Sequence, residues 1–268
     1  MLLNASHLAI TYGNAAPAVT DVSFTLAPGE VLSIVGESGS GKTSVIRALL
    51  GCLGGGGRIS GGEAVFAGKE LTTLSASAWR SLRGRELSMI FQDSGAMLNP
   101  VKTIGSQFVE YILAHSTSIK DKAQGKERAK TLLSRMNLAM PENILSSYSF
   151  ELSGGMRQRV GIAMALAFHP KLLLADEPTA ALDVTTQAQV VKELMKICRE
   201  DGTAIILVTH NLGVATYMSD KIMVMQNGSV VEHGTAEEVI EHAQKDYTKE
   251  LLRAVPQIGG ERYDSIGA

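Results

Sequence analysis

Cysteine and net charge are both scarce in this sequence. The 268 residues include only two cysteines, Cys52 and Cys198, which stand far apart along the chain. Two separated thiols are too few for a disulfide scaffold or a zinc site. The formal net charge is only −2, so the chain lacks the global basic field that nucleic-acid-binding proteins use. We therefore expect no nucleic acid among its partners.

Long apolar stretches are missing as well. No uncharged apolar run approaches the ~20 residues that a membrane-spanning helix needs. The N-terminal sequence MLLNASHLAITYG has neither a basic start nor a long apolar segment, so it does not resemble a secretory signal. Apolar residues make up 45% of the chain and charged residues 19%, which excludes a disordered protein. We expect a soluble, cytosolic chain with a sizeable core.

Short apolar runs alternate with a helical pattern along the chain. Residues 31–35, 172–175 and 204–208 each predict a buried strand. Between the last two runs, residues 187–199 place four apolar side chains on one helical face. These are Val190, Val191, Leu194 and Ile197. A strand, a helix and a strand in this order indicate a parallel sheet with right-handed crossovers.

Two other segments depart from that alternation. Residues 221–225 and 229–232 flank the turn Gln226-Asn227-Gly228, which predicts a β-hairpin. Residues 93–152 are richer in helix formers and charge and contain no strand-like run. We interpret them as a helical insertion between elements of the sheet.

Residues 36–43 read GESGSGKT, which fits the pattern G-x-x-x-x-G-K-[ST] of a phosphate-binding loop. The loop follows a predicted buried strand and precedes a predicted helix at residues 44–50, as its mechanism requires. Backbone N–H groups of such a loop and the helix N-terminus bind phosphate oxygens. Lys42 would place a cation on the β- and γ-phosphates, and Thr43 would offer its hydroxyl to Mg²⁺. The predicted phosphate-binding residues are Gly36, Glu37, Ser38, Gly39, Ser40, Gly41, Lys42, Thr43 and Ser44.

Two acids follow the apolar run at residues 172–175. The strand carries Asp176 to its carboxyl end, which is where ligands bind in open α/β sheets. There Asp176 can hold the Mg²⁺ that bridges the phosphates. The adjacent Glu177 can polarise the attacking water as a general base. Together with the loop, the acid pair predicts hydrolysis of a nucleoside triphosphate.

The segment Leu152-Ser153-Gly154-Gly155-Met156-Arg157-Gln158-Arg159 resembles the signature sequence of ABC-transporter ATPases. The remaining motifs of that family occur in order over residues 1 to about 255. The resemblance implies that Tyr12 stacks on adenine and that Gln92 touches Mg²⁺ and the membrane partner. It also implies that residues 181–183 (Ala-Leu-Asp) cross to the opposite subunit, with Asp183 near the nucleotide. His210 matches the histidine that contacts the γ-phosphate.

The resemblance implies an α/β fold with a nucleotide-binding core, a mostly parallel sheet, an N-terminal antiparallel β subdomain and an inserted helical subdomain. The expected division is a single ATPase domain at residues 1–255, with a helical subdomain at about 93–156 and the core at 1–92 and 157–235. A C-terminal helix and tail would occupy residues 236–268.

ATP and Mg²⁺ are the implied cofactors. Each ATP would lie between the loop at residues 36–43 of one subunit and Ser153, Gly154 and Gly155 of another. Those signature residues open a helix expected at about residues 156–168. The implied partners are two transmembrane permease subunits, a second ATPase subunit, either a different chain or the same one, and indirectly a solute-binding protein. The chain would act peripherally at the cytoplasmic face of the inner membrane.

Within the family, the sequence is most similar to the ATPases of peptide and nickel importers. The similarity rests on Phe91-Gln92-Asp93, Leu98-Asn99-Pro100, Met156 in the signature and the tail at residues 246–252. One departure is Ala180, which replaces the usual serine of the crossing loop. A second departure is that no cysteine follows Cys198. Because an iron–sulfur cluster needs several thiolates, we expect none in this chain.

Several alternatives remain open at this stage. A soluble, non-transport ABC ATPase of the translation or DNA-repair type usually carries two cassettes, coiled-coil insertions or basic arms, and none is evident here. A GTPase would need an N-K-x-D element, which the sequence lacks. Intact Lys42, Asp176, Glu177 and His210 argue against an inactive binding module. The substrate, peptide or nickel with its carrier, stays undecided, as does the choice between homodimer and heterodimer. So does hydrolysis at one or both ATP sites, and import is an inference from family similarity alone.

Overall fold

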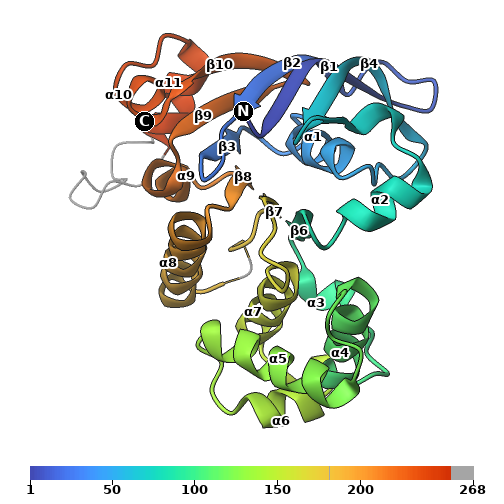
Figure 1. Ribbon diagram of the computed structural model, residues 1–268. Coiled ribbons are helices and arrows are strands. Elements are labelled where there is room, and N and C mark those ends of the chain that lie inside the picture. The colour runs from blue at the N-terminus through green and yellow to red at the C-terminus, as the bar shows by residue number, and fades with distance from the viewer. Residues whose placement is uncertain (181, 255–268) are drawn as a thin grey trace.

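A six-stranded sheet lies at the centre of the molecule, with strand order β10-β9-β3-β8-β7-β6 (Figure 1). The structure is a computed structural model and describes residues 1–180 and 182–254. All neighbouring strands of this sheet pair in parallel except β9 and β10, which form the predicted antiparallel hairpin. The strands are β3 (Val31–Val35), β6 (Leu87–Ile90), β7 (Leu172–Asp176), β8 (Ala204–Thr209), β9 (Lys221–Gln226) and β10 (Ser229–Thr235). Every residue of β3, β6, β7 and β8 is buried, which explains their continuous apolar runs.

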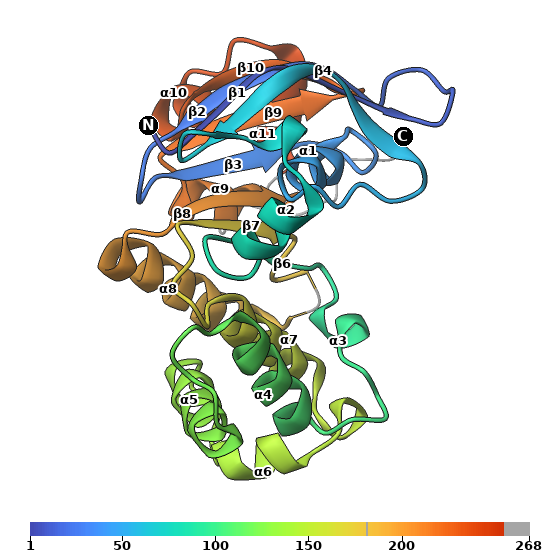
Figure 2. The same ribbon diagram turned by 45° about the vertical axis from the view of Figure 1, so that its right-hand side comes forward.

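A second, antiparallel sheet covers the upper part of the molecule in Figure 2, with the order β2-β1-β4-β5. Its strands are β1 (Leu3–Tyr12), β2 (Val19–Leu26), β4 (Gly57–Phe66) and β5 (Lys69–Glu70). Helix α1 (Lys42–Leu49) packs between this sheet and β3, with Val45, Ile46 and Leu49 fully buried in the shared core. The short helices η1 (Leu71–Thr73) and α2 (Ala76–Leu82) then lead to β6. The predicted combination of a parallel-rich core and an N-terminal antiparallel sheet is confirmed.

The segment predicted as a helical insertion forms the lower part of the molecule in both ribbon views (Figures 1 and 2). Its elements are α3 (Ser94–Met97), α4 (Ile104–His115), α5 (Lys122–Arg135), α6 (Pro141–Ser146) and η2 (Ser149–Glu151). Helix α7 (Gly154–Ala165) packs against α3 and α5 and also against β6 of the core. Apolar side chains from α4, α5, α7 and the sheet share one buried cluster. The helical part is therefore joined to the core through α7.

Three predicted helices have different bounds in the structure. Helix α1 begins at Lys42 rather than residue 44, so the last residues of the loop motif form its first turn. Helix α7 spans Gly154–Ala165 rather than residues 156–168. It starts earlier because the Ser153 hydroxyl caps it by accepting the Met156 N–H at 3.3 Å. Helix α8 (Val184–Asp201) exceeds the predicted residues 187–199, with Gly202 in the left-handed conformation at its C-cap.

The C-terminal part of the described chain packs near β9 and β10, at one end of the central sheet (Figure 1). It contains α9 (Leu212–Met218), α10 (Ala236–Glu241) and α11 (Asp246–Arg253). The tail expected beyond residue 254 lies outside the described residues. The division into subdomains at residues 93, 157 and 236 stays a prediction, and the boundary at 156/157 falls within α7. Within residues 1–180 and 182–254, no helix combines the length and apolar character needed to cross a membrane.

Candidate functional site

The glycine-rich loop between β3 and α1 folds tightly against neighbouring backbone. Gly36 has a φ of +146° and Gly41 a φ of +98°, values that residues with a side chain rarely adopt. A Cβ atom on Gly36 would lie 2.1 Å from the carbonyl oxygen of Met225, and one on Gly41 would lie 2.8 Å from Val19 Cγ2. Both contacts are too short for real atoms. Glycine is therefore required at these two positions by the close packing as well as by the backbone conformation.

The Lys42 ammonium lies inside the curve of this loop. Lys42 is only 7% exposed, and its Nζ donates to the carbonyl oxygens of Gly36 at 2.7 Å and Glu37 at 2.6 Å. Nζ also lies 3.3 Å from the Ser40 hydroxyl, a weaker third contact. Burial lowers the pKa of the Lys42 ammonium, against the opposing effect of nearby carboxylates, chiefly Glu177. A compact cation is thus held where the loop would meet an anion.

Thr43 and Asp176 bring a hydroxyl and a carboxylate together from segments far apart in sequence. Thr43 is the second residue of α1, and Asp176 is the last residue of β7. The Thr43 hydroxyl donates to Asp176 Oδ1 at 2.9 Å. Asp176 is 2% exposed, and burial raises the pKa of its carboxyl despite this hydrogen bond. Such paired oxygen donors suit a hard divalent cation.

Glu177 and His210 follow the ends of neighbouring parallel strands. Glu177 comes directly after β7, and His210 directly after β8 (Ala204–Thr209). Their side chains meet, with His210 Nδ1 2.8 Å from Glu177 Oε1. Glu177 has a φ of +47°, which is unusual for a residue with a long side chain, and its N–H donates to the Val208 carbonyl at 2.9 Å. The backbone after β7 is therefore turned sharply, and this turn brings the carboxylate beside the imidazole.

Lys42, Thr43, Glu177 and His210 converge on one polar hollow of about 380 Å³, and Asp176, which does not line it, bonds to Thr43. The hollow lies beyond the carboxyl ends of β3, β7 and β8, where ligands bind in open parallel sheets. Gln92, which follows β6, also reaches it. Its lining residues are Ala18, Ser38, Gly39, Gly41, Lys42, Thr43, Ser44, Gln92, Glu177, Val208 and His210. The structure therefore gathers most of the predicted phosphate-site residues in one place, although they come from four separate segments.

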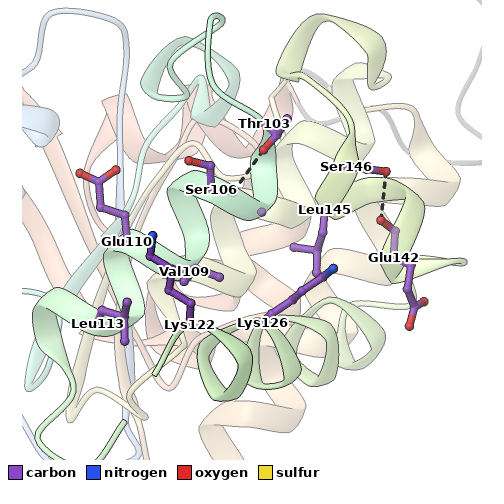
Figure 3. A pocket seen from close by; sticks show the side chains of 11 residues that line it. Thr103, Ser106, Val109, Glu110, Leu113, Lys122, Lys126, Glu142, Leu145 and Ser146 are labelled. Carbon is purple, nitrogen blue, oxygen red and sulfur yellow. Dashed lines mark hydrogen bonds between the residues drawn. The ribbon is translucent and has the colours of Figure 1, made fainter. Parts of the chain in front are cut away.

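A larger hollow of about 640 Å³ lies between α4, α5 and α6 (Figure 3). Apolar side chains such as Val109 and Leu145 line it, together with charged ones such as Glu110, Lys126 and Glu142. None of the predicted site residues contributes to it. The chemistry of the lining, rather than size, makes the smaller hollow the candidate site.

Tyr12 lies beside the phosphate loop but is not part of the hollow's lining. It is the last residue of β1, and its hydroxyl lies 2.9 Å from the Ser44 hydroxyl on α1. Tyr12 is half-buried, and its ring packs closely on Gly57, where an added Cβ would lie 2.7 Å from the ring. The ring position is thus tied to the helix that the loop opens.

The signature residues do not meet the hollow within one chain. Ser153 and Gly154 are exposed at the start of α7, and a Cβ on Gly154 would have nothing within 4 Å. Neither these residues nor Gly155 line the hollow. Asp183 is also exposed, and it caps α8 by accepting the Thr186 N–H at 3.0 Å. The predicted crossing loop includes residue 181, which lies outside the described residues.

Two side chains near the site were not expected from the sequence. Gln158, in α7, is 4% exposed, and its Nε2 donates to the Pro178 carbonyl at 2.9 Å. Its Oε1 accepts the Ser94 N–H at 3.3 Å, so it joins α7 to the segments that follow Gln92 and Glu177. Tyr247, in α11, accepts a hydrogen bond from the phosphate loop. The burial of Gln158 becomes evident only in the structure, and no sequence signal marked either residue.

Known proteins are similar to this chain over most of its length. A family model described as "ABC transporter" matches residues 19–180. The oligopeptide transport ATP-binding protein OppD of Salmonella typhimurium is 44% identical over 264 residues, covering 97% of this chain and 78% of that protein. AppD of Bacillus subtilis, also an oligopeptide transport ATP-binding protein, is 43% identical over 246 residues, with coverages of 91% and 74%. The dipeptide transport ATP-binding protein DppD of Escherichia coli is 41% identical over 264 residues, with coverages of 97% and 80%.

Solved structures support the same assignment of the fold. The ATP-binding cassette MJ0796, in a dimeric post-hydrolysis state bound to ADP and Pi, aligns with a TM-score of 0.79 and 27% identity. The alignment covers 88% of this chain and 99% of that one. The cbiO1 protein of Clostridium perfringens, part of an ABC transporter complex, aligns with a TM-score of 0.75 and 25% identity, covering 90% and 91% of the two chains.

Proposed function

Because this chain belongs to the ABC transporter family, as an ATP-binding ATPase subunit, we propose that its polar hollow hydrolyses MgATP to drive the uptake of peptides. One observation carries the catalytic part of the proposal. Lys42, Thr43, Gln92, Glu177 and His210 come from four segments and line a single hollow beside the glycine-rich loop. An ordinary glycine-rich turn would have no reason to collect these groups.

The loop and Lys42 bind and orient the triphosphate. Backbone N–H groups of the loop and the α1 N-terminus would bind phosphate oxygens, and the ammonium would stabilise negative charge on the transferred phosphoryl group. In the described structure Lys42 Nζ bonds to two loop carbonyls, so it is already held beside the phosphate position. Tyr12 would stack on the adenine base next to Ser44.

The oxygen donors at the hollow fit Mg²⁺. This ion commonly takes one or two carboxylates together with phosphate oxygens and water, and it does not need a cage of protein ligands. Thr43 and Asp176 already form a hydroxyl–carboxylate pair at 2.9 Å, and Gln92 adds a carbonyl oxygen. These three residues would hold the ion, and the ion would neutralise charge on the β- and γ-phosphates.

Glu177 and His210 carry out the remaining chemistry. Glu177 would orient the attacking water and accept its proton as general base. His210, 2.8 Å from that carboxylate, would contact the γ-phosphate and keep the Glu177 side chain directed toward the water. The sharp backbone turn at Glu177 serves this geometry, because it aims the carboxylate into the hollow beside the imidazole.

A second ATPase subunit completes each site in this proposal. Ser153, Gly154 and Asp183 are exposed and away from the hollow, although they begin two long helices whose N-termini favour anions. Ser153 and Gly154 would meet the phosphates bound by the partner ATPase, and the loop that ends at Asp183 would cross to it. The partner is either a different chain or a second copy of this one. A different partner chain would make the two ATP sites unequal, and Ala180 in the crossing loop would add to that difference.

Peptides are the substrate class that the relatives favour. OppD, AppD and DppD are named for oligopeptide or dipeptide transport, and none of the three is a translation or DNA-repair protein. The soluble alternative therefore has no support from them. We propose that the chain binds two transmembrane permease subunits at the cytoplasmic face of the membrane, with a solute-binding protein delivering the substrate. Nickel with a metal carrier is the competing substrate, as the motif similarity does not separate the two.

Steady-state hydrolysis of MgATP by the assembled complex tests the catalytic proposal. Lys42→Ala should lower the rate by several orders of magnitude, because no other cation replaces the ammonium at the transferred phosphoryl group. Lys196→Ala, at an exposed position on α8, is the matched control and should retain the wild-type rate. A Lys42→Ala complex that keeps a tenth of the wild-type activity would overturn the assigned role.

Transport is tested with proteoliposomes that contain this chain, its permeases and a candidate second ATPase. ATP-dependent accumulation of a labelled di- or oligopeptide is the expected result. Accumulation of ⁶³Ni²⁺ with its carrier, and not of peptide, would replace the proposed substrate while leaving the ATPase assignment intact. ATP hydrolysis that is unchanged by permeases and by either substrate would contradict the transport function itself.

A further inference from the structure

Helix α11 is hydrogen-bonded to the core at its N-terminus and packs on it along one face. The Glu232 carboxylate on β10 accepts the N–H groups of Gln244 at 2.7 Å and Lys245 at 3.3 Å, at the N-terminal end of the helix. Tyr247, Leu251 and Leu252 pack against a buried apolar cluster. The cluster consists of Val35, Leu212, Ala215, Ile222, Val224 and Val239. Since Val35 is the residue before Gly36, the helix packs on the strand end that leads into the phosphate loop.

The Tyr247 hydroxyl reaches that loop directly. It accepts the backbone N–H of Glu37 at 3.1 Å, across 210 positions in the sequence. The carbonyl of the same peptide unit belongs to Gly36 and accepts a hydrogen bond from Lys42 Nζ at 2.7 Å. One peptide plane of the loop is therefore held on one side by the C-terminal helix and on the other by the phosphate-binding lysine.

This contact lies outside the hollow. Neither Glu37 nor Tyr247 is among the residues that line it, whereas the following Ser38 and Gly39 are. Gly36 packs against the Met225 carbonyl, so the base of the loop rests on β9 as well as on α11. Tyr247 therefore supports the loop from the side opposite to the phosphate position and has no direct contact with that position.

We propose that Tyr247 is a positioning residue for nucleotide binding, which holds the Gly36–Glu37 peptide in the orientation that the lysine and the phosphates require. The inference rests on the proposed function of the hollow as an ATP site. A loop that is already ordered loses less conformational freedom when the ligand binds, so the ligand binds more tightly. The C-terminal helix thereby becomes part of the nucleotide site, although it contributes no group to the nucleotide itself.

Tyr247→Phe is the direct test, because it removes the hydroxyl and keeps the ring on its apolar cluster. Loss of one hydrogen bond to the loop should raise the Kd of the purified chain for a fluorescent ATP analogue with Mg²⁺ by ~3–10-fold. Tyr217→Phe is the matched control, since Tyr217 on α9 is 61% exposed, and its Kd should equal that of the wild type. Thermal melting without nucleotide reports the stability of each variant separately.

Hydrogen–deuterium exchange without nucleotide tests the contact itself. The Glu37 amide should exchange faster in Tyr247→Phe than in the wild type and in Tyr217→Phe, because its acceptor is gone. Faster exchange together with the raised Kd supports the proposal. An unchanged Kd, with or without a lower melting temperature, overturns it and leaves Tyr247 as a purely structural anchor. A wild-type chain that fails to bind the analogue contradicts the ATP site itself, a result that is distinct from either outcome for the variant.

Discussion

Replacing Gln158 by leucine should destabilise the protein strongly, although the two side chains are similar in size. Gln158 is buried in α7, and its amide bonds to the backbone of two other segments. Its Nε2 donates to the carbonyls of Pro178 at 2.9 Å and Phe91 at 3.4 Å, while its Oε1 accepts the Ser94 N–H at 3.3 Å. Leucine can form none of these bonds.

The expected cost follows from the groups that lose their partners. The Phe91 carbonyl keeps the Ser94 hydroxyl as a donor at 3.3 Å, so it is not left unpaired. The Pro178 carbonyl and the Ser94 N–H do lose their partner, and both residues are buried. An unsatisfied buried backbone group costs about 1–3 kcal/mol, so two such groups lower the free energy of unfolding by about 2–5 kcal/mol after a small apolar gain.

Urea denaturation of the purified chain measures this cost. Gln124→Leu, at an exposed position of α5, is the control and should change stability by less than about 0.5 kcal/mol. Gln158→Glu adds a second test, because its carboxylate cannot donate to Pro178 at neutral pH but can do so once protonated. Its stability relative to wild type should improve as the pH falls. Equal midpoints for Gln158→Leu and the Gln124→Leu control would refute the bridging role.

Three further predictions follow from the site and its surroundings. Glu177→Gln should still bind ATP but stop turnover, because an amide cannot accept the proton from water, and size-exclusion chromatography with MgATP should show a larger species than for wild type. Gly36→Ala should abolish binding of the fluorescent analogue and cost about 2–4 kcal/mol in urea denaturation, since its Cβ would lie 2.1 Å from the Met225 carbonyl oxygen at a positive φ. The ion pair with Lys171 lowers the pKa of the Glu86 carboxyl, so its stabilisation exists at neutral pH and is lost as the pH falls through the lowered pKa. Glu86→Gln should therefore cost about 0.5–1 kcal/mol at pH 7, and this cost should shrink steadily as the pH is lowered through the acid range. A cost that does not change with pH would exclude the ion pair as its origin.

The phosphate loop and its strand could be predicted from the sequence because their chemistry is local. The loop motif needs glycines, a lysine and a hydroxyl within eight consecutive positions, and a buried strand must be apolar along its whole length. The pairing of Asp176 and Glu177 with the loop was also predictable. Parallel strands have their carboxyl ends at one edge, so residues that follow different strands are brought together there.

Helix boundaries were harder to predict from the sequence, because capping decides them. Helix α7 begins two residues before the start expected at about residue 156, and the Ser153 hydroxyl satisfies the Met156 N–H there. The pattern of apolar side chains records which face of a helix is buried, but it carries little information on which residue begins or ends it.

Only the tertiary structure decided which polar side chains support the site. Gln158 and Tyr247 each bond to the backbone of a distant segment. The sequence pattern does not indicate which residue supplies such a bond. The left-handed backbone at Glu177 and the exposure of Ser153 likewise follow from how the sheet and helices pack. The sequence by itself determined which groups are proposed for the chemistry, because each motif is local. Packing determined which groups hold them in place, because a hydrogen bond between segments as far apart as Glu37 and Tyr247 exists only once β9, α11 and the loop have come together.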